Sequence, residues 1–133
     1  MPMGATCHVH ILTNVEVELQ KLSHEKLDVY QRSIEFLAVA VQLLESIPKG
    51  HGTIVDQLKR ASTSVPLNIA EAAGHPSDAK RAHHYAIARG SALECGSALD
   101  VCQILKVGNL SLVPIGKEHL VAVVSMLSKM CRK

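Results

Sequence analysis

From residue 27 onward, hydrophobic residues recur every three or four positions, the spacing that places them on one face of an α-helix. The first stretch with this spacing predicts a helix over residues 27–47, which ends before Pro48, Gly50 and Gly52. Its predicted buried stripe consists of Leu27, Tyr30, Ile34, Leu37, Val41 and Leu44.

A second helix is predicted from Thr53, whose hydroxyl suits an N-cap, to the residues before Gly74 and Pro76. Pro66 lies inside this helix and has no N–H, which frees the carbonyl of Ser62. The helix is therefore expected either to kink there or to be repaired by nearby hydroxyl groups. The predicted buried stripe is Ile54, Leu58, Ala61, Val65, Ile69 and Ala72.

Two further helices complete the pattern. Ser77 is a favourable N-cap for a third helix, which runs to residue 106 or 107 and stops at Gly108 and Asn109. A fourth helix begins near Pro114, because proline is favoured in a first turn. Apolar and small residues cover two sides of the third helix: Tyr85, Ala88, Ala92, Leu99 and Cys102 on one, and Ile87, Ala98, Val101 and Leu105 on the other. The fourth helix carries Leu120, Val123, Val124, Leu127 and Met130.

Four amphipathic helices joined by short loops predict an all-α fold, an antiparallel up-down-up-down four-helix bundle formed by residues 26–133. The helices carry more apolar surface than one bundle core requires, because residues 36–41 and 120–124 are apolar without interruption. Surplus apolar surface of this kind indicates a subunit interface. We therefore expect a homo-oligomer larger than a dimer.

Residues 1–25 follow a different pattern, in which apolar and polar residues alternate around Val9, Ile11, Val15 and Val17. A period of two is typical of short strands or of an extended segment. We therefore predict an N-terminal extension over residues 1–25 that forms an extended arm outside the bundle.

Composition adds limits rather than a function. The 133-residue chain is 47% hydrophobic with only three aromatic residues, and its net charge of +2 is no strong signature of nucleic-acid binding. Its four cysteines show no CxxC spacing and are expected to be reduced, small core residues. The sequence shows neither a signal peptide nor an apolar run of membrane-spanning length, so a cytoplasmic protein without a membrane partner is expected.

Four sequence blocks in the helical part carry a family resemblance. The blocks are Leu27-Asp28-Val29-Tyr30, Gln57-Leu58-Lys59-Arg60-Ala61, Val65-Pro66-Leu67-Asn68-Ile69-Ala70-Glu71, and Ala88-Arg89-Gly90-Ser91 with Glu94. Through these blocks, the segment from Leu27 to Met130 resembles the four-helix-bundle family encoded within intervening sequences of bacterial 23S ribosomal RNA genes. Tyr30 stands where this family often has tryptophan, and Ala72 where it often has glycine.

The resemblance implies a left-handed antiparallel four-helix bundle that assembles into a homopentamer around a central channel. A related branch of the family consists of basic accessory proteins of diversity-generating retroelements, which associate with a reverse transcriptase and nucleic acid. Most of the family has no defined biochemical role, so the resemblance implies a fold and an assembly but no specific function.

Four polar residues within these blocks are candidate partners at the crossing of the second and third helices: Asn68, Glu71, Ser91 and Glu94. The first two are three residues apart, as are the last two, so each pair shares a helix face. Buried polar groups are costly unless they are paired. We therefore expect a structural polar network, with Arg60 or Arg89 as its cation. The alternatives are a polar binding site or acid–base catalysis by the two glutamates.

No catalytic or metal-binding motif of established spacing accompanies this network. Cys7, His8 and His10 suit zinc, but no second cluster follows at the spacing of a zinc finger. No glutamate has a histidine three residues later, as a di-iron bundle requires. The segment from Gly50 to Thr53 lacks the lysine of a phosphate-binding loop. We therefore expect no catalytic residues, no metal, no cofactor and no enzymatic activity.

Basic residues on the second and third helices are the candidates for binding nucleic acid, because phosphate contacts need only a positively charged patch. An oligomer repeats such a patch, so we expect a non-enzymatic homo-oligomer that binds RNA or a nucleic-acid-handling partner such as a reverse transcriptase. The alternative is a protein–protein adaptor or assembly scaffold, in which these residues form only a solvated face. The candidate residues are Lys59, Arg60, Lys80, Arg81, His84 and Arg89.

Overall fold

The structure is a computed structural model that describes residues 22–131. The described residues form a short 3-10 helix and four α-helices, with no strand among them: η2 (Ser23–Lys26), α1 (Asp28–Ser46), α2 (Gly52–Ala73), α3 (Asp78–Leu105) and α4 (Leu112–Met130). This confirms the predicted all-α four-helix bundle. The predicted N-terminal arm lies outside the described residues, except for its last four positions.

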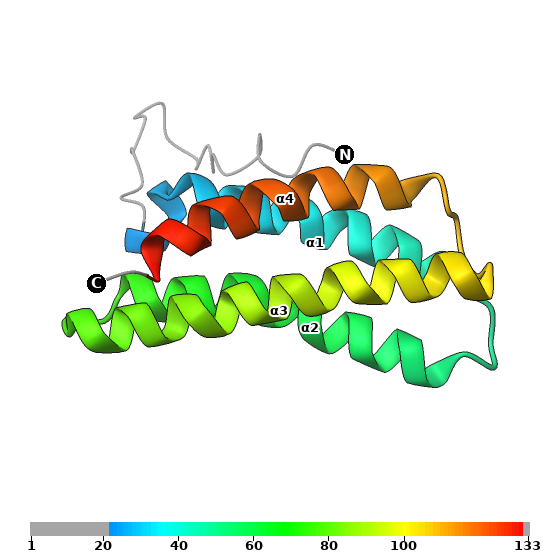
Figure 1. Ribbon diagram of the computed structural model, residues 1–133, viewed down its shortest axis with the longest axis horizontal. Coiled ribbons are helices and arrows are strands. Elements are labelled where there is room, and N and C mark those ends of the chain that lie inside the picture. The colour runs from blue at the N-terminus through cyan, green and yellow to red at the C-terminus, as the bar shows by residue number, and fades with distance from the viewer. Residues whose placement is uncertain (1–21, 132–133) are drawn as a thin grey trace, which may run out of the picture.

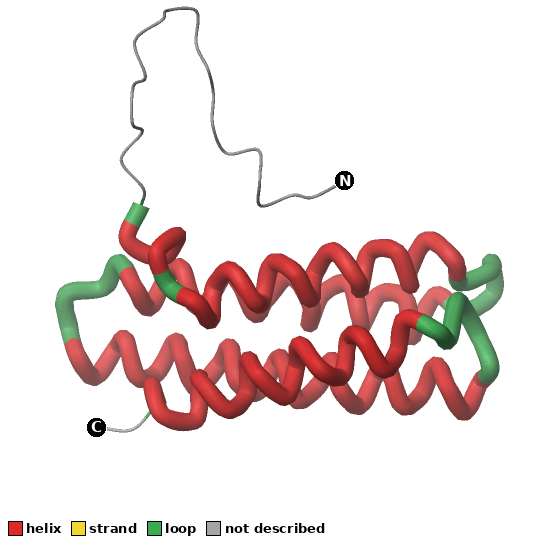
Figure 2. The backbone as a smooth tube through the Cα atoms, turned by 90° about the horizontal axis from the view of Figure 1, so that it is seen from above, coloured by secondary structure: helices red, strands yellow, loops and turns green. Residues whose placement is uncertain are grey.

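The four long helices form two layers, with α1 and α4 in one and α2 and α3 in the other (Figure 1). Each helix contacts two neighbours, in the pairs α1 with α2, α2 with α3, α3 with α4, and α4 with α1. Neighbours run antiparallel, because positions that rise along α2 meet positions that fall along α3, as in Arg60 with Glu94 and Ser64 with Ser91. The connecting loops alternate between the two ends of the bundle (Figure 2).

The buried stripe of α1 differs from the prediction. The structure buries Val29, Ser33, Phe36, Ala40 and Leu43, whereas Val41 is 42% exposed and the other five predicted residues are only partly buried. Because Ser33 is a polar residue, the hydrophobic spacing places the predicted stripe on the adjacent row of apolar residues instead. In the structure, the Ser33 hydroxyl donates to the carbonyl oxygen of Tyr30 at 2.6 Å, which satisfies it within its own helix.

The predicted stripe of α2 and one of the two apolar sides of α3 are buried, whereas on the other side of α3 only Ala98 is buried and Ile87, Val101 and Leu105 are exposed. All six predicted positions of α2 are buried, as are Tyr85, Ala88, Ala92, Leu99 and Cys102 of α3. The Ser77 cap is also confirmed, since its hydroxyl accepts from the backbone N–H of Lys80 at 3.3 Å. Thr53 is not a cap, because α2 already begins at Gly52, and α4 begins two residues before Pro114.

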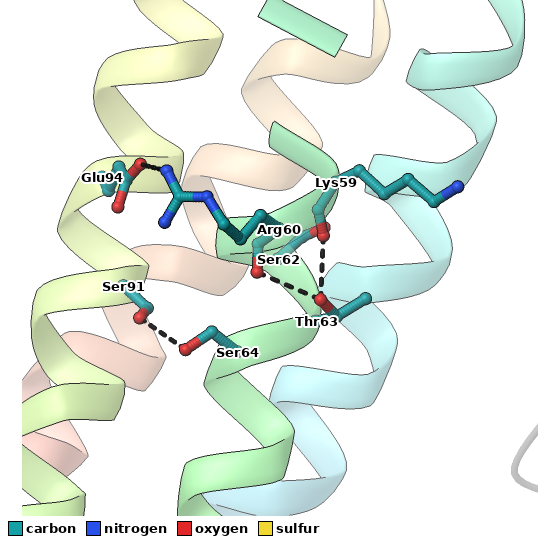
Figure 3. A network of polar contacts seen from close by, with 7 residues as sticks. All are labelled: Lys59, Arg60, Ser62, Thr63, Ser64, Ser91 and Glu94. Carbon is teal, nitrogen blue, oxygen red and sulfur yellow. Dashed lines mark hydrogen bonds and ion pairs between the residues drawn. The ribbon is translucent and has the colours of Figure 1, made fainter. Parts of the chain in front are cut away.

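Helix α2 continues through Pro66 and bends near its middle (Figure 1). One turn before the proline, the Thr63 hydroxyl contacts the carbonyl oxygens of Lys59 at 2.9 Å and Arg60 at 3.0 Å (Figure 3). The Ser62 hydroxyl also donates to the Lys59 carbonyl, at 3.2 Å. Hydroxyl groups bonded to the preceding turn bend helices. The predicted bend therefore occurs, whereas the hydroxyl groups bond the carbonyls of Lys59 and Arg60 and not the Ser62 carbonyl that Pro66 frees.

Candidate functional site

A row of hydrogen bonds joins α2 to α3, and we call its four residues the polar seam: Ser64, Asn68, His84 and Ser91. Asn68 Nδ2 donates to the Ser64 carbonyl oxygen at 2.9 Å and lies 3.0 Å from Ser64 Oγ. The Oγ atoms of Ser64 and Ser91 are 2.8 Å apart (Figure 3). Two predicted network residues, Asn68 and Ser91, are thus joined through Ser64. Ser64 was not among the predicted network residues, although its position one turn before Asn68 is a signal that could have identified it.

His84 extends the seam towards one end of the bundle. Its Nδ1 lies 3.3 Å from Asn68 Oδ1. Because Asn68 Nδ2 is directed at a carbonyl oxygen, which can only accept, the amide oxygen faces the imidazole and His84 Nδ1 is the donor. The imidazole of His84 also stacks on that of His75 with ring centroids 6.2 Å apart, and meets the edge of His83 at 5.5 Å. Histidines from the loop and from α3 therefore gather beside the seam.

The two glutamates of the predicted network lie elsewhere. Glu94 pairs with Arg60 at 3.0 Å, but the side chains are 41% and 68% exposed, so the pair contributes little stability, about 0.2–1 kcal/mol. Glu71 is exposed and takes part in no hydrogen bond or ion pair recorded among residues 22–131. The prediction of a buried network that includes Glu71 is therefore wrong. Glu71 lies one turn after Leu67, which is also exposed, so both face outward.

Basic residues gather at the α2–α3 end of the bundle, and we call this group the histidine corner: His75, Lys80, Arg81, His83 and His84. Arg81 is held in place, since its Nη1 donates to the His75 carbonyl oxygen at 2.7 Å and its Nη2 pairs with Asp78. Lys80 and His83 are exposed. The corner therefore presents nitrogen donors from several side chains to solvent.

The other candidate cations do not join the histidine corner. Arg60 contacts Glu94, which lies fourteen residues, or about 21 Å of helix, from Lys80. Arg89 faces α4, where its Nε donates to Ser128 Oγ at 2.8 Å. The six predicted nucleic-acid-binding residues thus occupy three separate places: Lys59 and Arg60 midway along α2, the corner with Lys80, Arg81 and His84, and Arg89 between α3 and α4.

Hollows on the surface are open rather than enclosed. One is lined by Ala86, Arg89, Ser128 and Cys131. Another, between α1 and α4, lies beside Arg32, whose Nε donates to His119 Nδ1 at 2.7 Å. Among residues 22–131, no group of three histidine, cysteine or acidic side chains is placed to hold a metal ion. The candidate Cys7, His8 and His10 lie outside the described residues.

Two cysteines of α3 are buried in the core as expected. Burial raises the pKa of the Cys95 thiol to about 12, and the neighbouring Glu94 carboxylate adds to this effect. Burial also raises the pKa of Cys102. Both thiols are therefore protonated at neutral pH and act as small apolar side chains.

The outer face of α3 carries five of the ten exposed large hydrophobic side chains among residues 22–131, more than any other helix. We use this name for the exposed residues Ala86, Ile87, Gly90, Leu93, Ser97, Val101, Ile104 and Leu105. Ile104 is 82% exposed. The uninterrupted apolar run of α1, by contrast, is buried or half-buried apart from Val41. Each of the two apolar runs singled out in the sequence thus leaves one exposed large side chain, Val41 in α1 and Val121 in α4, whereas the outer face of α3 leaves five.

Comparison with known proteins agrees with this bundle. The model of the family described as 23S rRNA-intervening sequence protein matches residues 25–129, a span that reaches from η2 to the last turn of α4. Comparison with curated protein sequences gives no match. None of the described helices is long and apolar enough to cross a membrane. The family match covers well over half of the sequence, and we conclude that the chain belongs to the 23S rRNA-intervening sequence protein family.

Proposed function

We propose that this protein is a non-enzymatic assembly protein, whose copies associate through the outer face of α3 and bind RNA through the repeated histidine corner. A pentamer is the assembly that the family resemblance implies. The observation that carries the proposal is the outer face itself, a row of exposed Ile, Leu and Val side chains on a helix whose opposite side already fills the bundle core. Exposed apolar patches of this kind are typical of protein interfaces.

The free energy available from burying this face is comparable with the cost of association. Burying a fully exposed Leu, Ile or Val contributes about 1.5–3 kcal/mol, so five side chains that are on average half-exposed contribute about 4–8 kcal/mol per copy. Association costs about 4–15 kcal/mol in lost translational and rotational freedom. Burial of this face therefore offsets much of that cost, and the partner's contacting surface adds to it.

RNA binding is supported by the kind of side chains that the histidine corner presents. Lys80 and His83 are exposed, and the Arg81 guanidinium is held beside them by His75 and Asp78. Phosphate oxygens accept hydrogen bonds from such groups without regard to base sequence. One corner is a small patch, but an assembly repeats it once per copy, and repetition raises the overall affinity without any new contact.

We expect weak, sequence-tolerant RNA binding that falls steeply with salt and depends on the histidine corner. Replacing Lys80 and Arg81 with alanine removes two phosphate contacts per copy. The plot of log binding constant against log salt concentration should therefore become less steep by about 1.4 for each copy that contacts single-stranded RNA. The measurement is a fluorescence anisotropy titration of a labelled single-stranded RNA at several salt concentrations.

The control is the double variant Lys49→Ala, Lys106→Asn, which removes two exposed cations from the other end of the bundle. Asparagine is chosen at position 106 because this residue has a positive φ of 57°. The control should bind RNA like the wild type. Equal loss in both double variants would indicate that net charge, not the corner, attracts RNA, and absence of binding by the wild type at low salt would remove RNA from the proposal.

A protein–protein adaptor without nucleic-acid binding is the second candidate. It is favoured by the partners of the arginines, since Arg60 pairs with Glu94, Arg81 with Asp78, and Arg89 bonds Ser128. These contacts reduce the positive charge offered to a phosphate backbone. A wild-type protein that assembles normally but binds no RNA in the titration would establish this alternative.

A further inference from the structure

Gly90 has no role in the packing of its own chain. It lies in the interior of α3, where glycine weakens a helix relative to alanine. A Cβ atom added at Gly90 would meet nothing within 4 Å. Gly116 in α4 differs, because a Cβ there would lie 3.2 Å from Leu99 Cδ1 and 3.4 Å from Phe36 Cε1. The bundle itself therefore explains the glycine at position 116 but not the one at position 90.

Gly90 lies between two rows of exposed apolar side chains. Ile87 is on the side of α2, since it is one turn before Ser91, which contacts Ser64. Leu93 is on the side of α4, since it is one turn after Arg89, which contacts Ser128. Ser97, two turns after Gly90, continues the line of small residues between the rows. Small residues thus lie along the middle of the face, where a helix of another chain can come close to the backbone of α3.

We infer that a helix of a second copy of this chain crosses α3 in contact with the backbone at Gly90. The inference rests on the proposed self-association and names the point of closest approach. Small residues at a helix crossing allow two backbones to approach closely, and the larger side chains on either side then pack around the crossing helix. We choose a second copy as the partner because every solution of the protein contains other copies of the chain, each of which has helices that can cross α3.

The size of the face suits a subunit interface. The apolar part of α3, residues 86–105, is about 30 Å long, and with neighbouring helices spaced about 9 Å apart the face is about 25 Å wide. Leu67 on α2 and Val121 on α4, each 67% exposed, extend the apolar surface on both sides. The resulting area of about 750 Å² is close to the value of about 800 Å² per partner found in stable interfaces.

The charges beside this face do not repel a second copy of the chain. Arg60 pairs with Glu94 on the α2 side, and Lys117 pairs with Asp100 on the α4 side. Each pair is neutral overall, so two copies can meet without the repulsion that an unbalanced charge would cause. A partner recognised mainly by its charge would instead require a net positive or net negative charge on this face.

The chain contains its own matched control, because Gly90-Ser-Ala-Leu is repeated as Gly96-Ser-Ala-Leu six residues later. A Cβ added at Gly96 would lie 4.0 Å from Leu120 Cδ1, an ordinary contact inside the bundle. Gly90→Ala and Gly96→Ala therefore make the same chemical change in the same helix, one on the outer face and one on the inner side.

The test compares both variants with the wild type by sedimentation velocity over a dilution series and by thermal melting at the lowest concentration. Gly96→Ala should raise the melting temperature and leave the dissociation constant of the assembly within twofold. Gly90→Ala should raise the melting temperature of the dissociated chain and raise the dissociation constant at least tenfold. Gly90→Leu, with a larger side chain, should abolish assembly while the circular dichroism spectrum remains helical.

The outcomes separate this inference from the proposed function. If the wild type assembles and both Gly90 variants assemble equally well, the crossing at Gly90 is wrong while self-association stands. If the wild type is a single chain at every concentration, self-association is wrong and the crossing with it. Loss of assembly in Gly96→Ala as well as in Gly90→Ala would show that helix stiffness, not contact at Gly90, controls assembly.

Discussion

Ile104→Glu should convert the assembled wild type into single chains of 14.3 kDa without loss of helical structure. Ile104 is 82% exposed in the single chain, so a carboxylate there remains hydrated and costs the fold little. In an assembly that covers the outer face of α3, the same carboxylate is buried without a partner, which costs several kcal/mol. The measurement is size-exclusion chromatography with light scattering, together with circular dichroism to confirm that the helices remain.

The control for this substitution is Gln42→Glu, which adds the same charge at an exposed position of α1. It should leave the mass of the assembly unchanged. If Ile104→Glu keeps the wild-type mass, the outer face of α3 is not the interface. If both variants dissociate, the added charge acts through general repulsion rather than through burial.

Gly108→Ala should lower the free energy of unfolding by about 3 kcal/mol, combining the strain of a positive φ with overpacking of the core. Gly108 has a φ of 83°, and an added Cβ would lie 2.9 Å from Leu43 Cδ1 and 3.0 Å from Ile47 Cγ1. It would also lie 3.1 Å from Ser46 Oγ, which accepts a hydrogen bond from the Asn109 N–H. The measurement is urea unfolding followed by circular dichroism.

Gly50→Ala separates the two contributions to this loss. Gly50 also has a positive φ, 102°, but a Cβ there would meet nothing within 4 Å, so only the backbone strain of about 1–2 kcal/mol is expected. Equal losses at both positions would mean that the contacts of Gly108 with α1 contribute nothing. The difference between the two variants thus measures how tightly the α3–α4 turn packs against α1.

Most of the fold could be predicted from the sequence because helix periodicity, caps and breakers are local signals. The stripe of α2, the cap at Ser77 and the antiparallel bundle were all predicted correctly. The phase of α1 was not, because two adjacent apolar rows compete there and the decisive core residue, Ser33, is polar. A buried serine whose hydroxyl is hydrogen-bonded within its own helix cannot be distinguished from a surface serine by hydropathy alone.

The candidate site was harder to predict because it depends on how each helix is rotated towards its neighbours. Asn68 and Glu71 are close in sequence and share a broad helix face, yet Asn68 reaches Ser64 and His84 while Glu71 is exposed. Similarly, Arg81 and Arg89 lie about two turns apart on α3, but Arg81 contacts His75 in the loop before α3 whereas Arg89 contacts Ser128 on α4. Spacing along one helix predicts shared faces, whereas the neighbour that each face meets is set by packing.

The mass of the wild-type protein in solution tests the central claim most directly. Light scattering at micromolar concentration should give a single species larger than a dimer, and five times 14.3 kDa if the assembly is the pentamer that the family resemblance implies. A species of 14.3 kDa over the same range would contradict self-association through the outer face of α3.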